Sequence, residues 1–126
     1  MQEVRRAAVA GLFYPSSPRE LEPTVEEFLQ GAQVGTGHET APKAVIAPHA
    51  GYVYSGAIAG SALAPFQREA DQIEKIVLLG PAHRVPVRGL ALPGVDGFET
   101  PLGIVPIDAT LAEQVLTLPQ VRVSQA

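Results

Sequence analysis

Two short apolar runs flank a segment rich in small residues, and this arrangement constrains the fold more than any other feature of the sequence. Residues 43–47 (KAVIA) are bounded by prolines, and residues 75–79 (KIVLL) are followed by Gly80 and Pro81. Residues 55–66, between the runs, contain many small residues and predict a helix suited to close packing on a sheet: Ala57, Ile58, Ala59, Ala62, Leu63 and Ala64. Short continuous apolar runs are typical of buried strands, and a strand, a helix and a strand in succession form a βαβ unit with parallel strands. We therefore predict an α/β fold.

Capping and turn signals predict the other elements. Ser17 and Pro18 precede apolar residues at helical spacing, which predicts a helix that ends at Gly31. Asp108 is expected to cap a helix over residues 109–118. Further strands are expected at residues 88–93, 103–107 and 121–123, around a turn-rich segment at residues 94–103.

The composition indicates one globular domain over residues 1–126, with 46% hydrophobic residues. The chain contains no cysteine, which excludes disulfides and thiolate metal ligands. With 9 basic against 13 acidic residues the net charge is −4, so the basic surface that nucleic acids or anionic membranes require is missing. No apolar stretch is long enough for a transmembrane helix. We expect a cytoplasmic protein whose partners are small molecules or other proteins.

Two of the 3 histidines follow the two apolar runs. His49 comes shortly after residues 43–47, and His83 shortly after residues 75–79. Open α/β sheets bind ligands beyond the carboxyl ends of their strands, and adjacent strands lie about 4.8 Å apart. The two imidazoles are therefore expected to share one crevice and to grip a metal ion, whereas each histidine alone is more simply explained as a packing residue. His38, in a glycine-containing connector, is not assigned to the site.

The segment at residues 51–56 (GYVYSG) offers polar groups to the same crevice. It lacks the lysine of a phosphate-binding loop and the spacing of a serine-hydrolase elbow. Ser55 is expected at the start of the helix, either as a plain N-cap or beside amides of Gly56 and Ala57 that hold an anionic oxygen. Tyr52 and Tyr54 are expected either to line the crevice or to pack beside the glycine turn.

A carboxylate near the histidine pair would complete a facial triad of the kind that holds ferrous iron. Asp96, Glu99 and Asp108 are the candidates. Asp96 lies in a turn-forming sequence, and Asp108 is already needed as a helix cap. No third ligand is assigned from the residues alone.

Four segments, taken in order, resemble the Memo family. They are AGLFYP at residues 10–15, IAPHAGYVYSG at 46–56, LGPAH at 79–83 and VDGFETPLG at 95–103. The resemblance implies a three-layer αβα fold with a largely parallel or mixed sheet, similar to class III extradiol dioxygenases. It also implies that His49 and His83 bind Fe(II) or Cu, with Tyr54 and Ser55 on the substrate side of the metal.

The resemblance further implies partners and a longer polypeptide. Prokaryotic Memo proteins are associated with a radical-SAM protein, as protein B of the AmmeMemoRadiSam system. Memo proteins are much longer than this chain and carry their third ligand in the second half, so the sequence is expected to be the N-terminal portion of a longer domain. Dioxygenase-like activity would then depend on the other half.

Two alternative functions remain open. The first is a non-catalytic protein-interaction module with a vestigial crevice, and the second is a metal-independent hydrolase centred on Ser55. Half of a parallel sheet leaves an unpaired edge and an uncovered apolar face, so self-association is also expected.

Overall fold

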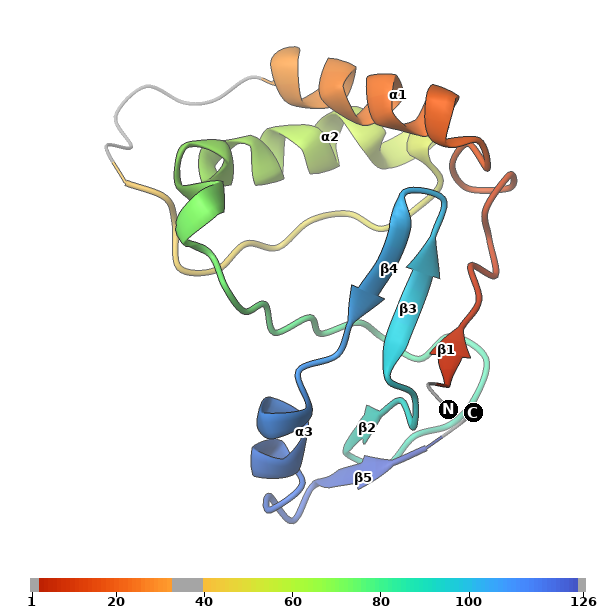
Figure 1. Ribbon diagram of the computed structural model, residues 1–126, viewed down its shortest axis with the longest axis vertical. Helices are drawn as coiled ribbons and strands as arrows, with labels where there is room; N and C mark the ends of the chain where they lie inside the picture. Colours follow the sequence, from red (N-terminus) through yellow and green to blue (C-terminus); the bar gives the residue numbers. More distant parts are fainter. Residues whose placement is uncertain (1–2, 33–39, 125–126) are drawn as a thin grey trace. The chain divides into compact units, whose positions relative to one another are not determined.

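The computed structural model describes residues 3–32 and 40–124 of the chain, so His38 lies outside the described residues. The chain falls into two compact units, one formed by Ala8–Glu74 and the other by Met1–Ala7 together with Lys75–Ala126. Helices and a mixed sheet confirm the predicted α/β class (Figure 1). None of the described helices is long and apolar enough to cross a bilayer. The assignment of residues 1–126 to a single domain stays a prediction.

The unit Ala8–Glu74 is helical. Helix α1 (Pro18–Gln30) begins after Ser17, with proline in its first turn, and ends at Gly31, as predicted. Helix α2 (Tyr52–Leu63) continues into a 3₁₀ helix, η1 (Ala64–Gln72). Helix α2 begins earlier than predicted because Gly51, and not Ser55, occupies the N-cap position.

Helices α1 and α2 pack closely because α2 carries glycines where they meet (Figure 1). A Cβ atom on Gly60 would lie 2.7 Å from the backbone oxygen of Phe28, and one on Gly56 would lie 2.5 Å from the Phe28 ring. The small residues of this segment were expected to permit close packing on a sheet. Within the described part of this unit, they instead permit close packing on α1.

The second unit contains a three-stranded sheet in the order β1-β3-β4. Strand β1 (Val4–Arg5) runs parallel to β3 (Gly97–Thr100), which pairs antiparallel with β4 (Gly103–Pro106). Asp96 reinforces the short β1: the Glu3 amide donates to Asp96 Oδ2 at 2.8 Å, and the Asp96 amide donates to the Glu3 carbonyl at 2.7 Å.

A separate two-stranded parallel sheet pairs β2 (Leu90–Leu92) with β5 (Val121–Val123). The strands predicted at residues 88–93, 103–107 and 121–123 are thus confirmed, with small differences at their ends.

Residues 94–103 were expected to be rich in turns and no strand was predicted within them, but β3 lies there. The strand was missed because it begins at Gly97, and glycine disfavours strands. Its position in β3 is close-packed, since a Cβ atom there would lie 2.8 Å from the Ile104 side chain. Glycine at this position therefore serves packing between β3 and β4.

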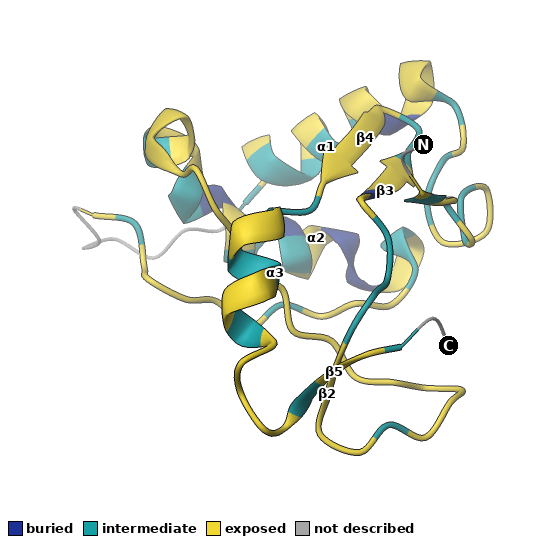
Figure 2. Ribbon diagram, turned by 60° about the horizontal axis from the view of Figure 1, so that its bottom comes forward, coloured by how far each residue is buried: buried dark blue, intermediate teal, exposed yellow. Residues whose placement is uncertain are grey.

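Residues 43–47 and 75–79, which were predicted to be strands, form no strand in the described structure. The two runs belong to different units, and their parallel pairing in a βαβ unit stays a prediction. Both runs are mostly exposed, with relative accessible surfaces of 99% for residue Ile46 and 88% for residue Leu78 (Figure 2). An apolar, β-branched sequence favours extended backbone, but a strand forms only when a neighbouring strand accepts and donates its hydrogen bonds. Within its own unit, neither run has such a neighbour among the described residues.

Helix α3 (Ala109–Val115) confirms the predicted cap. The Leu111 amide donates to Asp108 Oδ1 at 2.8 Å, and Lys75 Nζ lies 3.1 Å from Asp108 Oδ2. The Leu111 hydrogen bond, followed by the one from Lys75, lowers the pKa of Asp108 below its ordinary value of 3.8.

We predict that Gly60→Ala destabilises the chain by about 1–2 kcal/mol, because crowding against the Phe28 backbone exceeds the gain in helix propensity. Gly80→Ala is the matched control, since a Cβ atom there would meet nothing within 4 Å. It should change stability by no more than about 0.5 kcal/mol. Chemical denaturation measures both, and equal stability of the two variants would contradict the packing described for α1 and α2.

We predict that Asp108→Asn lowers stability at neutral pH and that the loss shrinks as the pH falls below about 3.8. A carboxylate with a lowered folded-state pKa stabilises the fold above its unfolded pKa, and that contribution disappears as the folded form is protonated. Urea titrations at several pH values measure the effect, with Asp71→Asn, at an exposed position of η1, as control. A pH-independent difference between wild type and Asp108→Asn would contradict this account.

Candidate functional site

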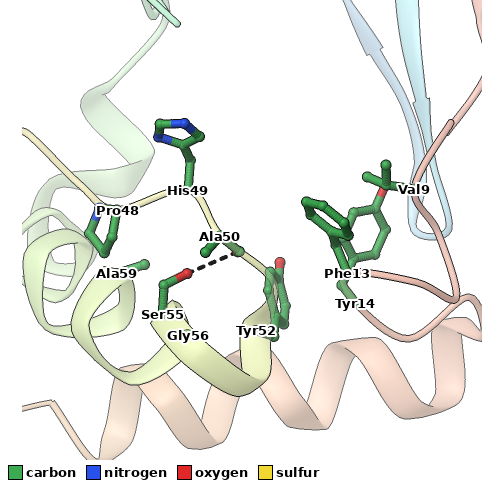
Figure 3. A pocket seen from close by; sticks show the side chains of 10 residues that line it. All are labelled: Val9, Phe13, Tyr14, Pro48, His49, Ala50, Tyr52, Ser55, Gly56 and Ala59. Atoms are coloured by element: carbon green, nitrogen blue, oxygen red, sulfur yellow. Dashed lines mark hydrogen bonds between the residues drawn. The ribbon is translucent and has the colours of Figure 1, made fainter. Parts of the chain in front are cut away.

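A pocket of about 270 Å³ lies in the unit Ala8–Glu74, between the segment before α1 and the start of α2 (Figure 3). Aromatic side chains of Phe13, Tyr14 and Tyr52 line it together with His49 and Ser55. Apolar walls with a few polar groups are typical of small-molecule sites. The pocket is therefore the candidate site within this unit.

Tyr52, the first residue of α2, lines the pocket and also packs against α1. Its ring centroid lies 5.6 Å from that of Tyr14 and 6.0 Å from that of Phe28, the latter in an edge-on arrangement. Its amide donates to the Phe13 carbonyl at 2.7 Å. The turn before α1, which needs Gly11 at φ 82°, is thereby fixed against the first residue of α2.

The environment of Tyr52 also affects its ionisation. Burial raises the pKa of the Tyr52 hydroxyl above 10.0, and the neighbouring Tyr14 raises it further. Tyr52 is therefore a neutral hydroxyl throughout the physiological range and can donate or accept a hydrogen bond at the pocket.

Ser55 has a structural role in the described geometry. Its side chain is buried, and its Oγ donates to the Ala50 carbonyl at 2.9 Å (Figure 3). Its amide donates to the Gly51 carbonyl at 3.1 Å, so Ser55 lies inside the first turn of α2. The prediction of Ser55 as N-cap is wrong, and so is that of an anion site at Gly56 and Ala57, whose amides lie within the helix. The Ser55 hydroxyl instead fixes the backbone next to His49.

The predicted metal ligands lie in different units. His49 is exposed at the rim of the pocket, where its ring points away from Ser55 (Figure 3). His83 is exposed in the unit that includes Lys75–Ala126. Tyr54, predicted on the substrate side, is 86% exposed and does not line this pocket. The shared crevice of the two histidines stays a prediction.

The candidate third ligands all have other partners. Asp96 binds the Glu3 amide and Asp108 caps α3, as described above. Glu99 Oε2 accepts from the Ala7 amide at 3.4 Å. Within residues 3–32 and 40–124, no three histidine or acidic side chains lie close enough together to hold a metal ion. The donor groups described here therefore do not fit a complete three-ligand iron site.

Phe13 and Tyr14 line the pocket, although the sequence alone did not predict a role for either residue. Both belong to the segment AGLFYP, and an aromatic pair directly before a helix N-terminus was the available signal. Their contact with α2 depends on the turn at Gly11, which an aromatic pattern alone does not specify.

Comparison with known proteins identifies the family. The family model described as Memo-like protein matches residues 5–125. A MEMO1 family protein of Aquifex aeolicus is 39% identical over 116 residues, which cover 92% of this chain and 41% of that protein. A MEMO1 family protein of Methanocaldococcus jannaschii is 37% identical over 122 residues, covering 90% and 42%. The memo-1 homolog of Caenorhabditis elegans is 32% identical over 115 residues, covering 90% and 31%.

The chain is therefore an α/β protein of the Memo type. It belongs to the Memo-like family, as its sequence motifs indicated, and its helices and mixed sheet are consistent with the extradiol dioxygenase-like fold of that family. The chain spans about two fifths of the length of the Aquifex aeolicus relative, 41%.

We predict that the tyrosine absorbance of the chain, which has 3 tyrosines, contains one component that titrates above pH 10.0 and that Tyr52→Phe removes it. Tyr54→Phe, which changes an exposed ring outside the pocket, should leave that component in place. Because the folded-state pKa is raised, neutral Tyr52 stabilises the fold below pH 10.0, and this contribution is lost as the pH rises through the folded pKa. Spectrophotometric titration of the three proteins measures the effect; an unchanged curve for Tyr52→Phe would contradict the burial.

Proposed function

We propose that this chain is the part of a Memo-like metal-binding protein that supplies two imidazole ligands, His49 and His83, for Fe(II) or Cu. Neutral imidazole suits both metals. A third ligand would come from outside the described residues, since no three-ligand group is present among them.

The observation that carries the proposal is the matched position of the two histidines in a chain of the Memo-like family. Each follows an apolar run, at residues 43–47 and 75–79, and both side chains are exposed. His49 also stands at the rim of an aromatic pocket that contains a neutral tyrosine hydroxyl. A ligand held at His49 would therefore lie beside a largely apolar wall.

Within this proposal, residues of this chain bind the substrate and orient the ligand His49. Tyr14 and Tyr52 present ring faces and hydroxyl groups to a small organic substrate, and the pocket walls limit water. Ser55 holds the Ala50 carbonyl and so fixes the backbone on which His49 is mounted. Dioxygenase-like chemistry and partnership with a radical-SAM protein belong to the proposal as properties of a complete Memo protein.

A non-catalytic interaction module is the second candidate, favoured by the exposed apolar runs. Partner capture in the presence of a chelator separates the two functions. A binding module without a metal keeps its partner when EDTA is added, whereas a metal-dependent site loses it.

We predict that Cu(II), and Fe(II) without oxygen, bind the chain and that His49→Ala or His83→Ala each weakens binding by at least ~10-fold. Isothermal titration calorimetry measures the affinities. The matched control is His38→Ala, which removes the third histidine and should leave the affinity unchanged. Equal affinities for wild type and all three variants would overturn the assignment of His49 and His83.

A further inference from the structure

Asp96 and Gly97 form the one aspartyl-glycine pair in the sequence, since the other two aspartates precede glutamine and alanine. In such a pair, the backbone nitrogen of the glycine can attack the side-chain carboxyl carbon of the aspartate. Glycine favours this attack because it has no Cβ atom to hinder the approach and allows more backbone conformations than other residues. The pair is therefore the position in the sequence most open to spontaneous isomerisation of aspartate.

This isomerisation needs no reactant besides water. A bond forms between the Gly97 nitrogen and Cγ of Asp96, and one hydroxyl of the protonated carboxyl leaves as water with the amide proton. The product is a cyclic succinimide. A water molecule then opens the ring at one of its two carbonyl groups. Opening at the main-chain carbonyl leaves the Gly97 nitrogen bonded to Cγ, and the residue is then isoaspartate.

The folded chain holds both residues in a geometry that opposes ring closure. Asp96 Oδ2 accepts from the Glu3 amide at 2.8 Å, and the Asp96 amide donates to the Glu3 carbonyl at 2.7 Å. The Asp96 carbonyl accepts from the Ile107 amide at 2.9 Å. Gly97 is buried in β3, between β1 and β4. All these residues belong to one compact unit. The ring can close only after the carboxyl leaves Glu3 and the backbone at Asp96 rotates.

Packing requires glycine at position 97, so the fold depends on this reactive pair. A Cβ atom on Gly97 would lie 2.8 Å from the Ile104 side chain and 3.1 Å from the Val105 carbonyl oxygen. Both neighbours belong to β4, which would have to shift to admit a larger residue. Protection against isomerisation therefore rests on the contacts of Asp96 and not on the identity of the residue that follows it.

The contacts with the Asp96 carboxylate come from the start of a very short strand. Strand β1 consists of two residues, Val4–Arg5, and Glu3 directly precedes it. Val4 is half-buried, whereas Glu3 and Arg5 are exposed. Segments with few buried apolar contacts open locally at a lower free energy than global unfolding requires. Local release of β1 therefore frees Asp96 without unfolding of the whole unit.

We propose that Asp96–Gly97 is a modification site at which aspartate isomerises to isoaspartate when β1 detaches. The main chain of isoaspartate runs through Cβ and Cγ, so it is one carbon atom longer at this residue. The modified residue no longer presents its amide and its carboxylate to Glu3 in the register of β1 and β3. The isomerisation thus converts a reversible opening of β1 into a lasting one.

Incubation at neutral pH and physiological temperature tests the proposal, with isoaspartate at position 96 measured by peptide mapping. Glu3→Pro removes the amide that donates to Asp96, and Glu3→Ala is the matched control because it keeps that amide. We expect isomerisation at least ~10-fold faster in Glu3→Pro than in wild type, because a hydrogen bond to a charged group is lost. Glu3→Ala should isomerise at the wild-type rate. Equal rates in the two variants would overturn the proposal.

The wild-type chain provides a second measurement that does not depend on the folding of a variant. In concentrated urea β1 has no partner, so isoaspartate at position 96 should form at least ~10-fold faster than in native buffer. Failure to form isoaspartate in urea would show that the pair is not a modification site. Equal rates in urea and in native buffer would show that β1 does not protect it. Neither measurement involves a metal, so both are independent of the function proposed for His49 and His83.

Discussion

Pairing between strands is the constraint on which the secondary structure of this chain depends. Strand β1 has only two residues, Val4–Arg5, yet it is a strand because β3 lies beside it and Asp96 holds Glu3 through both its amide and its carboxylate. Residues 76–79 are far more apolar and have no strand partner among the described residues of their own unit. The availability of a partner, rather than apolar content, therefore decides which segments join a sheet.

The fold could be predicted from the sequence wherever a signal acts within one turn. Ser17, Pro18 and Gly31 delimit α1, and Asp108 marks the start of α3, because capping involves groups only a few residues apart. The run at residues 43–47 has an equally clear local pattern, but its conformation depends on a distant neighbour. Such long-range information is not contained in a short apolar run.

In the candidate site, too, roles that depend on contacts between distant segments were not predicted. The sequence alone selected His49, and the structure places it at a pocket. Tyr14 was not selected, because its place in the wall depends on a glycine turn and on the hydrogen bond between Tyr52 and Phe13. Ser55 was assigned the wrong local role because the helix begins at Tyr52, where Gly51 serves as cap.

The contact of Phe28 with α2 has an evolutionary consequence. Its ring lies close to Gly56, where a Cβ atom would lie 2.5 Å from it, and the same ring packs edge-on against Tyr52, although Phe28 itself does not line the pocket. Drift at position 28 would thus alter both the spacing of two helices and the tilt of one pocket wall. Selection for a new ligand can therefore act on this family through a residue that does not line the pocket.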